Sequence, residues 1–142
     1  MKQGRGRIYP AFDGIEAEIG FLFELHARAT DLVGGLPDEV MNAELYGHSV
    51  GQLLDHMIDA EIDWISRVAG IRRPSPVSTC DEAAHFTRRA LRRFTLESEI
   101  AVGPFTCVSQ VLRHLQWHWT YHSAQIGLLR KALGHEYKWV FK

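Results

Sequence analysis

The sequence has few cysteines and no long hydrophobic run. Only Cys80 and Cys107 occur, and neither belongs to a Cys-x-x-Cys pair, which argues against a disulfide framework and against a thiolate zinc site. No apolar stretch approaches the roughly 18 residues of a membrane span. None follows the basic N-terminus as in an export signal. These absences predict a protein of the reducing cytoplasm that is neither exported nor embedded in a membrane.

The chain also lacks an excess of charge of either sign. Its formal net charge is -1 and its pI is near 6.7, so no overall field would draw it onto nucleic acid or anionic lipid. Four arginines, at positions 88, 89, 92 and 93, follow a helical spacing and offer one basic face. Such a face is more often the solvated side of a surface helix than a nucleic-acid patch. We therefore expect neither nucleic acid nor a membrane as partner.

What the chain does have is enough apolar residues for one core. It is 142 residues long and 46% apolar, which suits one domain over residues 1–142 and not two. Glycine and proline divide it into four segments of helical length, at about 11–32, 49–69, 81–100 and 105–133. No segment has the alternation and Asn-Gly or Asp-Gly turns of a hairpin. The sequence predicts an all-α, up-and-down four-helix bundle without a sheet.

The fourth segment brings three polar side chains onto an apolar helix face. Residues that alternate three and four positions apart share the side of a helix that faces a bundle core. In this segment they are Val108, Val111, Leu115, His118, His122, Gln125, Leu129 and Ala132. Burying an unpaired imidazole costs roughly 1–3 kcal/mol, so His118 and His122, one turn apart, predict a shared divalent metal ion. His114 extends the spacing, and a 114/118 pair is the alternative. Position on the apolar arc favours 118/122.

Two stretches together resemble a known family. Residues 111–130 read Val-Leu-Arg-His-Leu-Gln-Trp-His-Trp-Thr-Tyr-His-Ser-Ala-Gln-Ile-Gly-Leu-Leu-Arg, which resembles the last core helix of the DinB/YfiT-like superfamily, with its His-x-x-x-His and following glutamine. Residues 49–64, Ser-Val-Gly-Gln-Leu-Leu-Asp-His-Met-Ile-Asp-Ala-Glu-Ile-Asp-Trp, resemble the helix that supplies a third histidine. The resemblance implies that His56 is the third ligand. The helical wheel places His56 about 130° from the centre of the apolar arc, where we would expect an exposed side chain.

Glu61 is the opposite case, because it lies almost at the centre of the apolar arc of the second segment. A buried carboxylate needs a partner. One interpretation is catalytic: Glu61 accepts a hydrogen bond from a ligating imidazole, or acts as general base beside metal-bound water. The other is structural: it bonds a tyrosine, a tryptophan or Gln125 across the core, or pairs with an arginine.

Three neutral histidines leave a coordination position for water or substrate, which permits Lewis-acid chemistry. Imidazole discriminates poorly among zinc, nickel, iron and manganese. The fraction of sites that hold a metal should fall as the pH drops toward and below about 6.5, because a protonated imidazole cannot bind it. The resemblance implies transfer with a low-molecular-weight thiol, thiol-dependent isomerisation, or hydrolysis of a small molecule.

Other interpretations remain. The metal site could be vestigial or purely structural in a non-catalytic bundle. A di-iron bundle needs Glu-x-x-His on two helices, and only residues 82–85 match. The aromatic tail, residues 137–141, is more apolar than a free terminus should be and predicts packing on the bundle or on a second subunit, hence a homodimer.

Overall fold

The chain is mostly helical, and its all-α class is confirmed. The structure, a computed structural model, describes residues 14–74 and 76–139. The elements in chain order are α1 (Gly14–Val33), α2 (Asp38–Asn42), α3 (Val50–Ala69), α4 (Cys80–Ala90), β1 (Glu99–Val102), β2 (Phe105–Cys107) and α5 (Val108–Ala132). Residues 11–13 of the first predicted helix lie outside the described residues.

Local chemistry at the helix ends explains why α3 and α5 end where the sequence predicts. The side chain of Ser49 accepts from the backbone of Gln52, whose own side chain bonds the Ser49 backbone in return, a complete capping box. Gly70 ends α3 with φ of 67°, and Gly134 follows α5 with φ of 82°. Glycine adopts this left-handed conformation without a steric penalty.

The prediction for residues 81–107 is wrong in two respects. The third helix ends at Ala90 instead of near Ile100, and β1 pairs antiparallel with β2 in a two-stranded sheet that we did not predict. The connection is Gly103-Pro104, with Gly103 at φ of 55°. A glycine at the first position of a two-residue turn fits the type II′ hairpin. As a result α5 begins at Val108 and not at residue 105 or 106.

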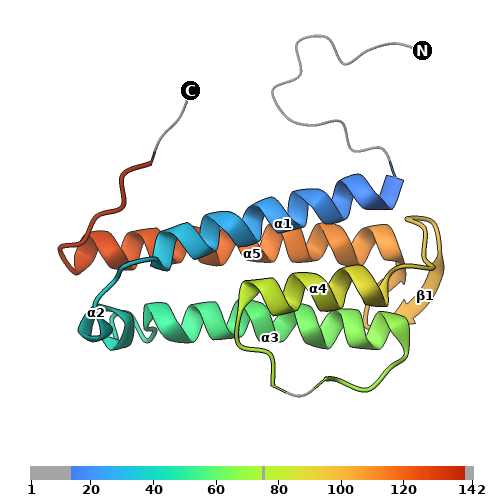
Figure 1. Cartoon of the computed structure of the whole chain (residues 1–142), viewed down its shortest axis with the longest axis horizontal. Coiled ribbons are helices and arrows are strands. Elements are labelled where there is room, and N and C mark those ends of the chain that lie inside the picture. Colours follow the sequence, from blue (N-terminus) through green and yellow to red (C-terminus); the bar gives the residue numbers. More distant parts are fainter. Residues whose placement is uncertain (1–13, 75, 140–142) are drawn as a thin grey trace, which may run out of the picture.

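The four long helices lie side by side, and two consecutive ones run in the same direction. The colours of Figure 1 show that α3 and α4 both run toward the end that carries the hairpin, whereas α1 and α5 run the other way. The connecting residues 70–74 and 76–79 lead back along α3 to allow this. The strictly alternating, up-and-down order is therefore wrong at that step.

The apolar faces of α1, α3, α4 and α5 meet in one core. Its fully buried side chains come from several helices and include Leu22, Met57, Ile65, Leu112, Trp119 and Ile126. No helix among residues 14–74 and 76–139 is long and apolar enough to cross a membrane.

The described part of the aromatic tail packs on its own chain. The Tyr137 hydroxyl donates to Asp31 at 3.2 Å. The Trp139 ring packs against Gly127, 3.1 Å from the position that a Cβ atom would take on that glycine. Val140 and Phe141, which also entered the prediction of a homodimer, lie outside the described residues.

Candidate metal centre

The three histidines singled out in the sequence come together between α3 and α5. One ring nitrogen from each of His56, His118 and His122 can be chosen so that all three lie within 4.8 Å of one another. His56 comes from the N-terminal half of α3, and the other two stand one turn apart on α5. His56 is exposed while the other two are partly buried, so the cluster lies at the surface with one side toward solvent.

The spacing of the cluster is close to that of a metal site. Nitrogen ligands about 2.1 Å from a tetrahedral ion are about 3.4 Å apart. The Nε2 atoms of His118 and His56 lie 3.0 Å apart, and the widest separation in the group is 4.8 Å. Closing the wider gap needs a movement on the order of 1 Å, within the reach of a partly exposed imidazole rotating about its side-chain bonds.

Gln125 orients one of the rings. His122 Nδ1 lies 2.5 Å from the amide oxygen of Gln125. That oxygen can only accept, so Nδ1 carries the proton and donates, which leaves the lone pair of Nε2 free for an ion. Gln125 thus lies where it can orient the His122 ring. His118 has no such support, because its buried Nδ1 has no hydrogen-bond partner among the described residues.

The surroundings of two imidazoles in the cluster favour the neutral form. Burial of the ring, and after it the nearby imidazoles of His122, His56 and His114, lower the pKa of His118 to about 4. Burial also lowers the pKa of His122, although its hydrogen bond to Gln125 acts in the opposite direction. Neutral imidazole is the form that binds metal. Protons should therefore compete with a metal for His118 at a lower pH than the ordinary histidine value predicts.

The same shift predicts a pH dependence of stability in the metal-free protein. Unfolded His118 takes up a proton below about pH 6.5, whereas folded His118 does so only near pH 4. Between these values the unfolded state binds more protons, so stability falls as the pH falls. His118→Gln should flatten this part of the profile, measured by urea unfolding with a chelator present at pH 4–7.5. His85→Gln, which removes a surface imidazole, is the control. Parallel profiles for wild type and His118→Gln would contradict the shift.

The structure separates the alternative histidines from this group. The ring of His114 lies against Trp64 and Phe105, with centroids 5.7 and 5.3 Å away, and 5.9 Å from that of His118. The pair 118/122 is therefore the one that joins His56. The wheel was right that His56 is exposed, but it could not indicate that α5 lies beside that side of α3.

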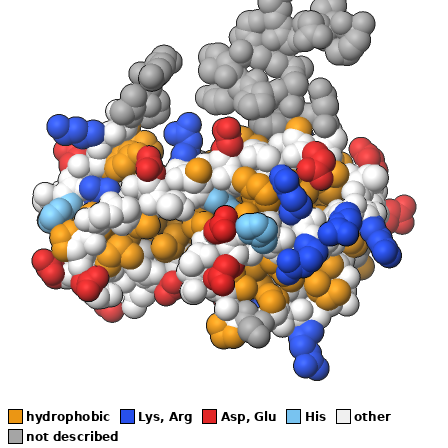
Figure 2. Space-filling view, in the orientation of Figure 1, with side chains coloured by type: hydrophobic (Ala, Val, Ile, Leu, Met, Phe, Trp, Pro, Cys, Tyr) orange, Lys and Arg blue, Asp and Glu red, His pale blue; other side chains and the backbone are white. Residues whose placement is uncertain are grey.

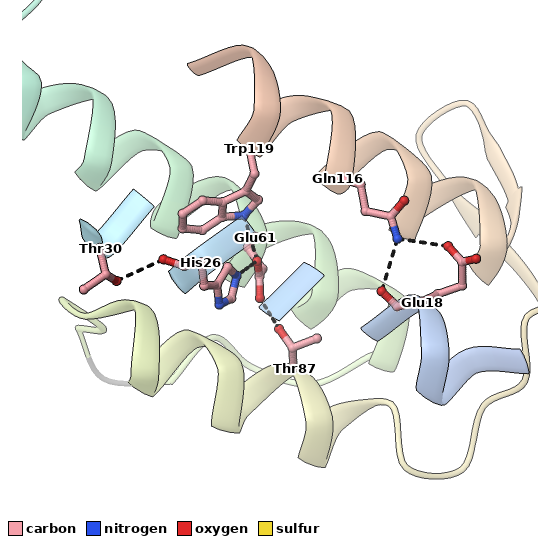
Figure 3. Close-up of polar contacts among 7 residues, drawn as sticks. All are labelled: Glu18, His26, Thr30, Glu61, Thr87, Gln116 and Trp119. Carbon is pink, nitrogen blue, oxygen red and sulfur yellow. Dashed lines mark hydrogen bonds and ion pairs between the residues drawn. The ribbon is translucent and has the colours of Figure 1, made fainter. Parts of the chain in front are cut away.

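Glu61 lies in a separate, fully buried network (Figure 3). Its Oε1 accepts from His26 Nε2 at 2.7 Å and from Trp119 Nε1 at 2.9 Å, and its Oε2 accepts from the Thr87 hydroxyl at 2.5 Å. None of the three donors belongs to the histidine cluster. Three hydrogen bonds on its two oxygens give this buried carboxyl group the partners that it needs, so the geometry favours the structural interpretation, including the predicted tryptophan bond.

No family model, curated protein or solved structure matches this chain.

Sequence reasoning did not find two of the three partners of Glu61, which are His26 and Thr87. His26 comes from α1 and Thr87 from α4, and both are buried. A signal was present, since each lies on the apolar face of its helix, where an unpaired polar group is costly. That cost predicts a partner for each, but the sequence does not say which helices face one another.

Proposed function

We propose that His56, His118 and His122 bind one divalent metal ion, in a four-helix bundle of the DinB type. The convergence of three ring nitrogens from two helices carries this proposal. The lowered pKa values of His118 and His122 support it because they favour the ligating form. So does the Gln125 contact, which turns the lone pair of His122 Nε2 away from Gln125.

We further propose that the site is catalytic and acts on a small molecule. Three histidine ligands leave at least one position for water or substrate, and His56 stands at the solvent side of the cluster. A zinc, nickel, iron or manganese ion bound there would lower the pKa of a water molecule or bind a thiolate directly. Thiol-dependent transfer and hydrolysis are the reactions that this supports, with a low-molecular-weight thiol as cosubstrate. The chain's own part is to hold the imidazoles neutral and oriented.

The second candidate is a non-catalytic bundle with a structural or vestigial site. The 3.0 Å contact between His56 Nε2 and His118 Nε2 favours it, because a single proton between the two rings makes an ordinary hydrogen bond without any metal. We also propose a homodimer, supported by the exposed side chains of Trp117, Tyr121 and Leu128 on α5.

A cobalt titration tests the proposal. Chelator-treated protein should bind one equivalent of Co²⁺. Adding a small thiol such as 2-mercaptoethanol should then produce a saturable sulfur-to-cobalt charge-transfer band, since an open position accepts a thiolate. Activity follows with an activated ester for hydrolysis and an aryl halide plus thiol for transfer. If cobalt binds but its absorption spectrum does not change when the thiol is added, the site is closed and structural. If no cobalt binds, the metal proposal fails.

A further inference from the structure

The ends of α3 and α4 enclose a surface cavity that plays no part in the metal site. The two helices run in the same direction, so their C-terminal ends lie together near the hairpin (Figure 1). Between them lies a cavity of about 500 Å³ whose lining includes Ile71, Phe86 and Phe94 and also Arg89, Arg92 and Arg93. Apolar and cationic side chains thus share one concave surface.

The apolar part of the cavity has a buried base and an open rim. Phe86 is 5% exposed, and Ile71 at the rim is 49% exposed. Phe94 is partly buried against the core. An apolar group that enters the cavity would cover Ile71 and lose its own contact with water, which is favourable in proportion to the area covered.

The arginines of the cavity have no carboxylate partner among residues 14–74 and 76–139. Residues 86–94 contain four arginines and no acidic residue. Neighbouring arginines are paired: Arg88 lies 3.9 Å from Glu16, and Arg73 contacts Asp59 and Asp63. Arg89, Arg92 and Arg93 form no ion pair with any residue of 14–74 or 76–139.

Helix electrostatics explain only part of this arrangement. A cation near a helix C-terminus is favourable, which accounts for Arg89 in the last turn of α4. Arg92 and Arg93 lie beyond that turn. Figure 2 shows Lys and Arg side chains gathered on the right half of this face, beside hydrophobic ones.

We propose that this cavity binds a small amphipathic anion, a molecule with a phosphate or carboxylate head and a short apolar body. The guanidinium groups would hold the head, because their planar forks match the oxygens of phosphate and carboxylate. Ile71 and Phe94 would contact the body. A nucleic acid fits less well, since it calls for an extended basic stripe, and here the charge surrounds an apolar cavity in a chain of net charge -1.

Calorimetry on the full chain, with and without metal, tests this proposal using octyl phosphate at concentrations where it stays monomeric. Inorganic phosphate supplies the head alone, and octyl glucoside supplies the same body without charge. Octyl phosphate should bind one to one and at least about tenfold tighter than either. Equal binding of octyl and inorganic phosphate would overturn the proposal, because the apolar lining would then contribute nothing.

Variants locate the binding. The double change Arg92→Gln and Arg93→Gln should weaken octyl phosphate binding at least about tenfold. The control, Arg113→Gln with Lys131→Gln, removes the same charge from α5, which contributes no lining residue, and should have little effect. Ile71→Ser should weaken octyl phosphate binding while leaving inorganic phosphate unchanged. If both double variants behave alike, the interaction is general electrostatics and the proposed site is wrong.

Two further titrations distinguish the source of the anion. Vesicles containing an anionic phospholipid, compared with neutral vesicles, test a lipid head group, and a single-stranded oligonucleotide tests nucleic acid. Binding of monomeric octyl phosphate together with anionic vesicles would identify a lipid as the source, and octyl phosphate alone a free small molecule. Saturable binding of the oligonucleotide without octyl phosphate would replace the proposal with a nucleic-acid surface.

Discussion

His118→Ala and His122→Ala should each abolish stoichiometric metal binding while leaving the helices folded. Each removes one of three nitrogen ligands and opens the cluster to water, so we expect affinity to fall by at least about 100-fold, the upper end of what loss of a supporting residue costs. Alanine has the highest helix propensity, so α5 should persist. Metal content by elemental analysis and helicity by circular dichroism are the measurements.

Matched variants separate the ligands from their surroundings. His85→Ala and His114→Ala remove imidazoles outside the cluster and should keep full metal content. His56→Ala should behave as the α5 variants do, and Gln125→Leu should weaken binding by about 10–100-fold because His122 loses its orienting acceptor. Full metal content in the His118 and His122 variants would show that the ion binds elsewhere.

Glu61→Ala should destabilise the protein more than any other single change to a polar residue discussed above. It removes the acceptor of three buried donors on α1, α4 and α5. Each donor left without a partner costs about 1–3 kcal/mol, so the total loss should reach several kcal/mol. That is a large fraction of the about 5–15 kcal/mol available to a domain. Urea unfolding with a chelator present measures the loss.

Glu61→Gln is the matched control. Its amide oxygen can still accept from His26 and Trp119, and its amide nitrogen can donate to the Thr87 hydroxyl. We therefore expect a loss of only about 1 kcal/mol, the ordinary worth of one hydrogen bond. Thr87→Val, which removes a single donor, serves as a milder variant if Glu61→Ala does not fold. Should Glu61→Gln keep full stability and full metal content yet lose activity, Glu61 would act in catalysis after all.

The helix ends and the hairpin show which parts of this fold the sequence can predict. Ser49, Gly70 and Gly134 act through contacts with residues a few positions away, so their effect is readable locally. The hairpin was missed because Leu96 and Ile100 both pack on the core, and their four-residue spacing is compatible with a continued helix. The Gly103-Pro104 turn was the available signal, and only an Asn-Gly or Asp-Gly turn was sought.

The site residues likewise differ in how far a local sequence pattern can predict them. His118 and His122 could be predicted because both lie on one helix, where 3.6 residues per turn decide which side chains share a face. The place of His56 in the cluster could not be derived from the pattern of its own helix, since its neighbours come from α5. His118, which it contacts, is 62 positions away along the chain. The burial of Glu61 was predictable from the apolar arc, but its partners come from three other helices whose packing a single sequence does not indicate.

The separation of the ligands along the chain has a consequence for how a bound ion would act on unfolding. An ion shared by His56 and His118 joins positions 62 residues apart, and a clip across a long loop removes many conformations from the unfolded chain. That loop contains α4 and the hairpin, whereas α1 precedes it. Metal would thus act as a reversible cross-link that keeps α3 and α5 together during local opening, while α1 remains attached by packing, hydrogen bonds and the Glu16–Arg88 ion pair.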